Sequence, residues 1–229
     1  SSLAPGKEMQ YDFKTLWTSV AAGKYTIMVR ISKSVTGDPD LKDEKQWDVC
    51  TGISGTYTIG KGPKADFSTF NDAVKELNCG IAGPVTFLVR PGTYNETVQM
   101  RTLLGASATN TVTFRSASID SVTLQYNSGF TLGLNGTKYT RWENMRIEAD
   151  ATIGFAVWMT NRSDYNKFTG CVIQANLTSS SSNSVALCMS NSSTQYSGYG
   201  DNGNFNEFRD NQFKGGYFTV ALMGTSTTD

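Results

Sequence analysis

The charged residues best placed to form a reactive site are Arg141, Glu143, Arg146 and Glu148, which alternate along one predicted strand. On the solvent face of a sheet, alternating basic and acidic residues make cross-strand charge pairs worth ~0.2–1 kcal/mol each. The chain contains no histidine. It therefore lacks Ser-His-Asp catalysis, histidine-ligated metals and imidazole acid–base chemistry. Any chemistry in this protein must use other residue types.

A second candidate is the acidic segment GDPDLKDEK, which places Asp38, Asp40 and Asp43 close together. Carboxylates at alternate positions suit a hard cation, so this turn could ligate calcium. The fixed spacing of an EF-hand is missing, and a solvated turn is the favoured interpretation. We expect no resident cofactor, with calcium as the alternative.

Two tyrosines, Tyr196 and Tyr199, lie in the loop-like segment TQYSGYGDNGN, outside the predicted strands. Exposed aromatic rings in such a loop could stack on sugar faces. In the alternative interpretation, both rings pack the loop against the wall of the fold. These tyrosines are the candidate ligand-binding residues of the sequence.

The four cysteines, Cys50, Cys79, Cys171 and Cys188, form no CxxC pair and have no zinc-site spacing. An even count permits disulfides in an oxidising compartment. Cys50 and Cys79 bracket the start of the repeating region, and they either form a disulfide or remain buried thiols. The other two fall within strand patterns, which favours buried thiols that behave as small apolar residues.

Composition limits the class of partner. Lysine plus arginine equals aspartate plus glutamate, 20 against 20 in 229 residues. This balance gives no electrostatic case for nucleic acid or an anionic membrane as partner. No apolar run approaches the length of a membrane span, so we expect no membrane insertion. The start, SSLAPG, lacks a methionine and an apolar signal segment, which is typical of a mature or internal start.

Residues 1–50 differ from the rest of the chain. Tyr25, Ile27, Val29 and Ile31 alternate with polar residues, which predicts a strand. Two or three strands bury too little apolar surface to form an independent domain. The segment resembles the closing strands of an immunoglobulin-like sandwich in bacterial adhesion-type repeats. The resemblance implies that the given sequence begins inside a domain.

Residues 66–98 predict a short helix followed by a buried strand, a proline-glycine corner and a second strand. Apolar residues spaced for one helical face are Phe70, Ala73, Val74 and Leu77. Thr69 and Asp72 form a near-match to a capping box, and Gly80 supplies a stop signal. We expect a helix at about residues 68–78 that closes the open end of a solenoid of strands.

Internal repetition supports that solenoid. PVTFLV from Pro84 recurs as TVTFRS from Thr111, an offset of 27 (111 − 84), and NETVQM from Asn95 has a looser echo in DSVTLQ from Asp120. Three longer segments also align: YTRWENMRIEA from residue 139, YNKFTGCVIQA from residue 165 and FNEFRDNQFKG from residue 205. Their offsets are 26 (165 − 139) and 40 (205 − 165). The insertions TSSSSNS and TQYSGYGDNGN account for the larger offset.

The alignment defines two columns of structural residues. Asn144, Gly170 and Asp210 are equivalent, and these residue types tolerate a left-handed backbone conformation at a corner. The other column is aromatic and predicted to fill the interior; its members are Phe87, Phe114, Trp142, Phe168 and Phe208.

Together these features resemble the right-handed parallel β-helix of the pectin-lyase-like superfold, on the segments DFSTFNDAVKEL and VTFLVRPGTYNETV. They are also similar to the opening of large secreted surface proteins of bacteria with type IX secretion. The resemblance implies an all-β fold: a right-handed parallel β-helix over residues 51–229 with a capping helix, preceded by the partial sandwich of residues 1–50. It also implies a β-helix cut short at its C-terminal end and a location outside the cell or on the bacterial cell surface.

Enzymes of this superfold provide motifs to compare. Polygalacturonases and mannuronan epimerases carry histidine motifs, and the characteristic strand of pectin methylesterases is absent here. Pectate lyases use an arginine base beside carboxylates that hold calcium, for which the nearest candidates are Arg141, Glu143, Arg146 and Glu148. The aligned positions of later coils carry no ladder of carboxylates, so a scaffold role for these four residues is favoured.

These observations predict a non-enzymatic extracellular module of a larger adhesin-like protein, a rigid scaffold with polysaccharide or protein contact through its inserted loops. One alternative is a polysaccharide lyase or esterase. Another is a structural component that self-associates by stacking coils of neighbouring copies.

Overall fold

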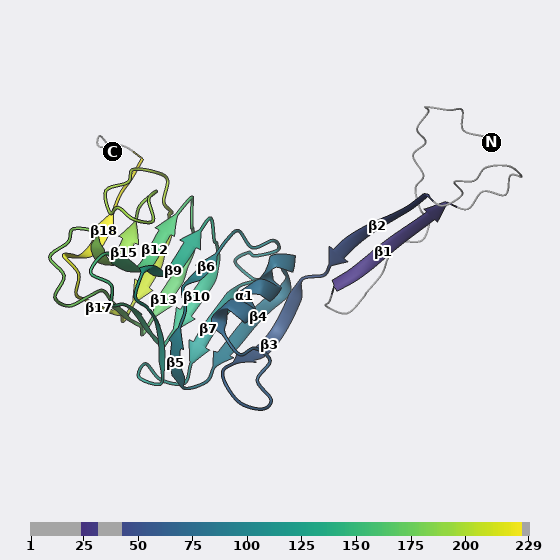
Figure 1. Cartoon of the computed structure of the whole chain (residues 1–229), viewed down its shortest axis with the longest axis horizontal. Coiled ribbons are helices and arrows are strands. Elements are labelled where there is room, and N and C mark those ends of the chain that lie inside the picture. Colours follow the sequence, from purple (N-terminus) through teal and green to yellow (C-terminus); the bar gives the residue numbers. More distant parts are fainter. Residues whose placement is uncertain (1–23, 32–42, 226–229) are drawn as a thin grey trace, which may run out of the picture.

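The computed structural model describes residues 24–31 and 43–225, which form an antiparallel hairpin and three stacked parallel sheets (Figure 1). In the hairpin, β1 (Lys24–Ile31) pairs with β2 (Asp43–Cys50), and Figure 1 shows it extending away from the sheets. The strand predicted from the alternation at residues 25–31 is confirmed. Of the acidic turn, Asp38 and Asp40 lie outside the described residues and Asp43 begins β2.

Each of the three sheets collects one strand from every coil. The first sheet contains β3 (Ile53–Ile59), β4 (Ile81–Val89), β7 (Val112–Ser116), β10 (Thr140–Glu143), β13 (Lys167–Thr169) and β16 (Glu207–Arg209). The second contains β5 (Gly92–Asn95), β8 (Val122–Tyr126), β11 (Arg146–Ala149), β14 (Val172–Gln174) and β17 (Gln212–Lys214). The third contains β6 (Val98–Met100), β9 (Gly129–Asn135), β12 (Gly154–Thr160), β15 (Ser184–Met189) and β18 (Phe218–Leu222). From β4 onward the chain visits the sheets in this fixed cyclic order, which produces a β-helix-like solenoid.

The pairing register confirms most of the predicted repeat. Trp142 lies opposite Phe168, and Phe168 lies opposite Phe208, as the offsets of 26 and 40 require. The looser repeat, which aligned Asn95 with Asp120, was wrong, because Asn95 lies opposite Gln125 in the second sheet. The turn between β7 and β8 is longer than the turn between β4 and β5, and this extra length shifts the register in the second sheet.

The predicted aromatic column fills the solenoid interior. Neighbouring ring centroids lie 4.8 Å apart for Phe87 and Phe114, 4.3 Å for Phe114 and Trp142, 6.4 Å for Trp142 and Phe168, and 5.2 Å for Phe168 and Phe208. The first four side chains are fully buried. Each coil therefore contributes one large ring to a continuous core, and each buried ring adds apolar area that stabilises the stack.

The corner column also has the predicted backbone conformation. Asn144, Gly170 and Asp210 have φ angles of 57°, 63° and 55°. Because the corner between the first and second sheets recurs with left-handed geometry, it selects residues that tolerate positive φ.

The predicted helix is present as α1 (Phe70–Glu76), continued by the 3-10 helix η1 (Leu77–Cys79). The Thr69 hydroxyl accepts the Asp72 N–H at 3.0 Å. The Glu96 carboxylate accepts the N–H groups of Phe70 at 2.9 Å and Asn71 at 3.0 Å. The buried Phe70 ring stacks 5.8 Å from the interior ring of Phe114. The helix therefore closes this end of the core.

Two of the four cysteines form a disulfide, and the other two are free thiols. Cys50 at the end of β2 forms a disulfide with Cys79 in η1, which ties the hairpin to the closing helix. Cys171 and Cys188 are buried free thiols. Burial raises the pKa of Cys171 to about 11 and that of Cys188 to about 12, which favours the neutral thiol in both.

No helix within residues 24–31 and 43–225 is long and apolar enough to cross a membrane.

Candidate functional site: a polar groove on the second sheet

The groove is built on the outward face of the second sheet. Alternation along each strand turns Leu124 and Ile147 into the core, and both are fully buried. The next residue of each strand then faces outward. The register aligns four such residues across successive coils, and we call them the polar ladder: Asn95, Gln125, Glu148 and Gln174.

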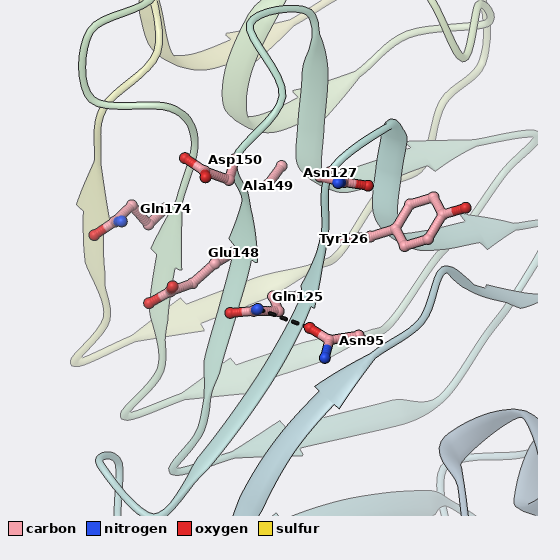
Figure 2. Close-up of a pocket in the computed structure, with 8 residues that line it drawn as sticks. All are labelled: Asn95, Gln125, Tyr126, Asn127, Glu148, Ala149, Asp150 and Gln174. Carbon is pink, nitrogen blue, oxygen red and sulfur yellow. Dashed lines mark hydrogen bonds between the residues drawn. The ribbon is translucent and has the colours of Figure 1, made fainter.

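The polar ladder forms one wall of a groove of about 460 Å³. Its other lining residues come from the ends of β8 and β11 and the turns that follow: Tyr126, Asn127, Ala149 and Asp150. Figure 2 shows the ladder side chains extending from adjacent strands, with the Gln125 amide donating to the Asn95 Oδ1 at 2.7 Å. Amide and carboxylate groups therefore line the groove at successive coils.

The electrostatic character of the groove is polar to acidic. Among the described residues that line it, none is lysine or arginine. Arg146 lies outside the lining, where its Nε donates to Glu148 at 2.6 Å and its Nη1 lies 3.7 Å from Asp120. The exposed Asp150 receives a hydrogen bond from Asn176 to its backbone carbonyl at 2.7 Å. The groove therefore presents many hydrogen-bonding groups and little positive charge.

The four charged residues predicted as an alternative reactive site do not share one strand. Arg141 and Glu143 lie on β10 of the first sheet, whereas Arg146 and Glu148 lie on β11 of the second. The single-strand prediction was wrong because Asn144 adopts positive φ and turns the chain between the two pairs.

Both glutamates of this set are held in ion pairs. The Arg115 Nε donates to Glu143 at 2.5 Å, and Arg146 pairs with Glu148. Within the described part of the chain, no group of three or more histidine, cysteine, aspartate or glutamate residues gathers as a metal site. The geometry is that of charge pairs on a sheet surface, and only Glu148 also belongs to the groove.

The two loop tyrosines lie away from the groove. Tyr196 is half-buried and packs against Phe218 of the third sheet, with ring centroids 4.9 Å apart. Its N–H donates to the Asn183 Oδ1 at 3.0 Å, which fixes the loop backbone. Tyr199 is exposed, with 49% of its surface accessible. Tyr196 thus packs its loop against the wall, while Tyr199 presents a free ring on a different part of the solenoid.

On the third sheet, the outward side of β12, β15 and β18 carries an apolar cluster. Phe155, Trp158 and Cys188 form a buried cluster there, against which Tyr196 packs. The Trp158 indole N–H donates to the Ser190 carbonyl at 2.8 Å, so its polar atom is satisfied. Tyr196 of the inserted loop therefore covers part of this cluster.

Three ladder residues, Asn95, Gln125 and Gln174, were missed as functional residues by the sequence reasoning. The alignment contained the signal for Gln174, since it placed that residue at the position of Glu148. Gln125 was hidden because its segment had been aligned out of register with Asn95.

Comparison of the chain with protein-family models and with curated proteins finds no match in either set.

Proposed function

We propose that this chain is an extracellular module of a larger surface or secreted protein, in which a right-handed parallel β-helix serves as a rigid scaffold and binds polysaccharide. The groove on the second sheet is the binding site, in place of the inserted loops. The observation that carries this proposal is the polar ladder, which repeats hydrogen-bonding side chains over four successive coils along one groove. A repeating polymer meets equivalent groups at each step of such a ladder.

Two further features support the setting. The Cys50–Cys79 disulfide suits an oxidising compartment outside the cytoplasm. The continuous aromatic core and the helix that closes one end suit a stiff element, since buried ring stacking leaves little freedom between coils. The hairpin β1–β2 is proposed to be the end of an immunoglobulin-like sandwich that precedes the β-helix.

The test is binding of the whole chain to a glycan array, followed by calorimetry with any oligosaccharide that scores. Gln125→Ala and Gln174→Ala should each weaken binding at least several-fold. Gln212→Ala is the matched control, because it removes the same amide from an exposed position of the same sheet outside the groove lining. Binding that is unaffected by both ladder substitutions would place the ligand elsewhere and overturn the proposal.

A second candidate function is cleavage of a polysaccharide in the same groove. Glu148 and Asp150 both line it, and glycoside cleavage commonly uses a pair of carboxyl groups. This candidate predicts turnover of a polysaccharide in an activity panel and its loss in Glu148→Gln and Asp150→Asn. Binding without turnover across the panel supports the scaffold proposal instead.

A further inference from the structure

We infer that the ligand of the groove is an uncharged polysaccharide that lies along the solenoid axis, across the strands. This inference rests on the proposed function, because it assumes that the groove binds a glycan. It adds the direction of the chain, the number of sugar units that make contact and the exclusion of uronate polymers.

The direction follows from where the polar groups repeat. Each strand of the second sheet has only three to five residues, so it supplies a ladder residue once and then turns away. Across the strands, the same position recurs at every coil, with neighbouring strands about 4.8 Å apart. A polymer that runs parallel to the solenoid axis therefore meets Asn95, Gln125, Glu148 and Gln174 in succession. A polymer parallel to the strands would meet one of them.

The preference for an uncharged ligand follows from the lining. Four amide or carboxylate side chains form the ladder, and such groups donate to and accept from hydroxyl groups. Asp150 and Glu148 contribute two carboxylates to the lining, and no lysine or arginine is found among the described lining residues. A uronate polymer would bring repeated negative charge toward these carboxylates, which costs free energy.

The nearby cations do not reverse this balance. Arg146 is already paired with Glu148 and also lies near Asp120. Lys214 continues the ladder one coil beyond Gln174, but it lies outside the groove lining. An acidic polymer would therefore meet the Glu148–Arg146 ion pair, whose charges offset each other, and the exposed Asp150 carboxylate, with Lys214 beyond the end of its path.

The experiment compares matched neutral and acidic probes. β-1,4-linked glucan, mannan and chitin oligomers of two to six units are titrated into the whole chain, together with the same oligomers oxidised to carboxylates at C6. The neutral oligomer that binds should do so about tenfold more tightly than its carboxylated counterpart at low salt. The affinity of that neutral oligomer should rise with its length up to about four sugar units and then level off, because the ladder spans four coils.

The double variant Glu148→Gln with Asp150→Asn provides the decisive comparison. It keeps the shape and most of the hydrogen-bonding capacity of the groove but removes both negative charges, so the preference for the neutral probe should fall to about twofold or less. Tighter binding of the carboxylated probe, if it is lost in Gln125→Ala, would overturn this inference and leave the proposed function intact. Absence of binding by every probe, or binding insensitive to Gln125→Ala, would overturn the proposed function and this inference with it.

Discussion

Replacing Gly170 by alanine is expected to destabilise the protein by about 1 kcal/mol, although the same substitution at an ordinary backbone position stabilises. Gly170 occupies the recurring corner with a φ angle of 63°. An L-residue pays ~1–2 kcal/mol in this left-handed region. Loss of glycine's freedom in the unfolded chain offsets ~0.4–1 kcal/mol of that cost. The new Cβ would also lie 2.6 Å from the Asn144 Oδ1, so that side chain must rotate away.

Two other glycines separate these contributions. Gly129 has a φ angle of 66° and no heavy atom within 4 Å of an added Cβ, so Gly129→Ala reports the backbone cost alone. Gly224 has the same open space without positive φ, so Gly224→Ala should be neutral or slightly stabilising. In the Asn144→Gly background the Oδ1 is gone, and Gly170→Ala should then cost no more than Gly129→Ala.

The assay is urea denaturation followed by circular dichroism, with stability compared at constant m. We expect the midpoint to fall most for Gly170→Ala, less for Gly129→Ala and not at all for Gly224→Ala. A midpoint that rises in Gly170→Ala would refute the reasoning, because it would show that the corner does not require a left-handed residue.

Three further predictions concern the closing helix and the cysteines. Glu96→Ala should lower the unfolding free energy by about 1–2 kcal/mol and speed amide hydrogen exchange in the first turn of α1, because the Glu96 carboxylate accepts two N–H groups there. Glu96→Gln should lose less stability, because its amide oxygen can still accept. Equal exchange rates in the two variants would contradict this role of the carboxylate. Since burial raises the pKa of Cys171 to about 11 and of Cys188 to about 12, the unfolded thiols ionise first, so stability should be full below pH 9 and fall as the pH rises from there. The check is thermal unfolding at pH 8 and pH 10 of the parent protein and of the double variant Cys171→Ala, Cys188→Ala. An equal drop in stability between the two pH values in both proteins would exclude the thiols as the cause. Reduction of the Cys50–Cys79 bond should lower the unfolding free energy by about 2–4 kcal/mol, whereas a Cys50→Ser, Cys79→Ser chain should not respond to reductant.

The core could be predicted from the sequence because its physical demands repeat. Each coil needs one large ring at the same depth, and each corner needs positive φ at the same step, so the ring of Trp142 and the corner residue Asn144 have recognisable partners in later coils. The same reasoning placed the helix, whose apolar spacing and cap are local signals.

The groove could not be predicted in the same way. Outward positions need only tolerate contact with water, so Gln125 carries no pattern that distinguishes it from other exposed amides. The alignment placed Gln174 at the position of Glu148, but it gave no sign that either side chain lines a groove. Their relation depends on the exact register of the second sheet, and the longer turn at residues 117–121 displaced that register from the one inferred. Arg141 and Glu148 lie on different strands, β10 and β11, because a corner interrupts a segment whose sequence resembled one continuous strand.

The two insertions at residues 178–184 and 194–204 lengthen one coil while Phe168 and Phe208 remain directly opposite each other. Sequence change can therefore accumulate at the corners without disturbing the hydrogen bonds or the ring stack. We therefore expect the interior to change slowly in evolution and the periphery to change rapidly. Related modules would then share the positions of Phe114 and Gly170 and differ in loop length, and loop grafting at these corners offers a practical route to new surfaces on an unchanged frame.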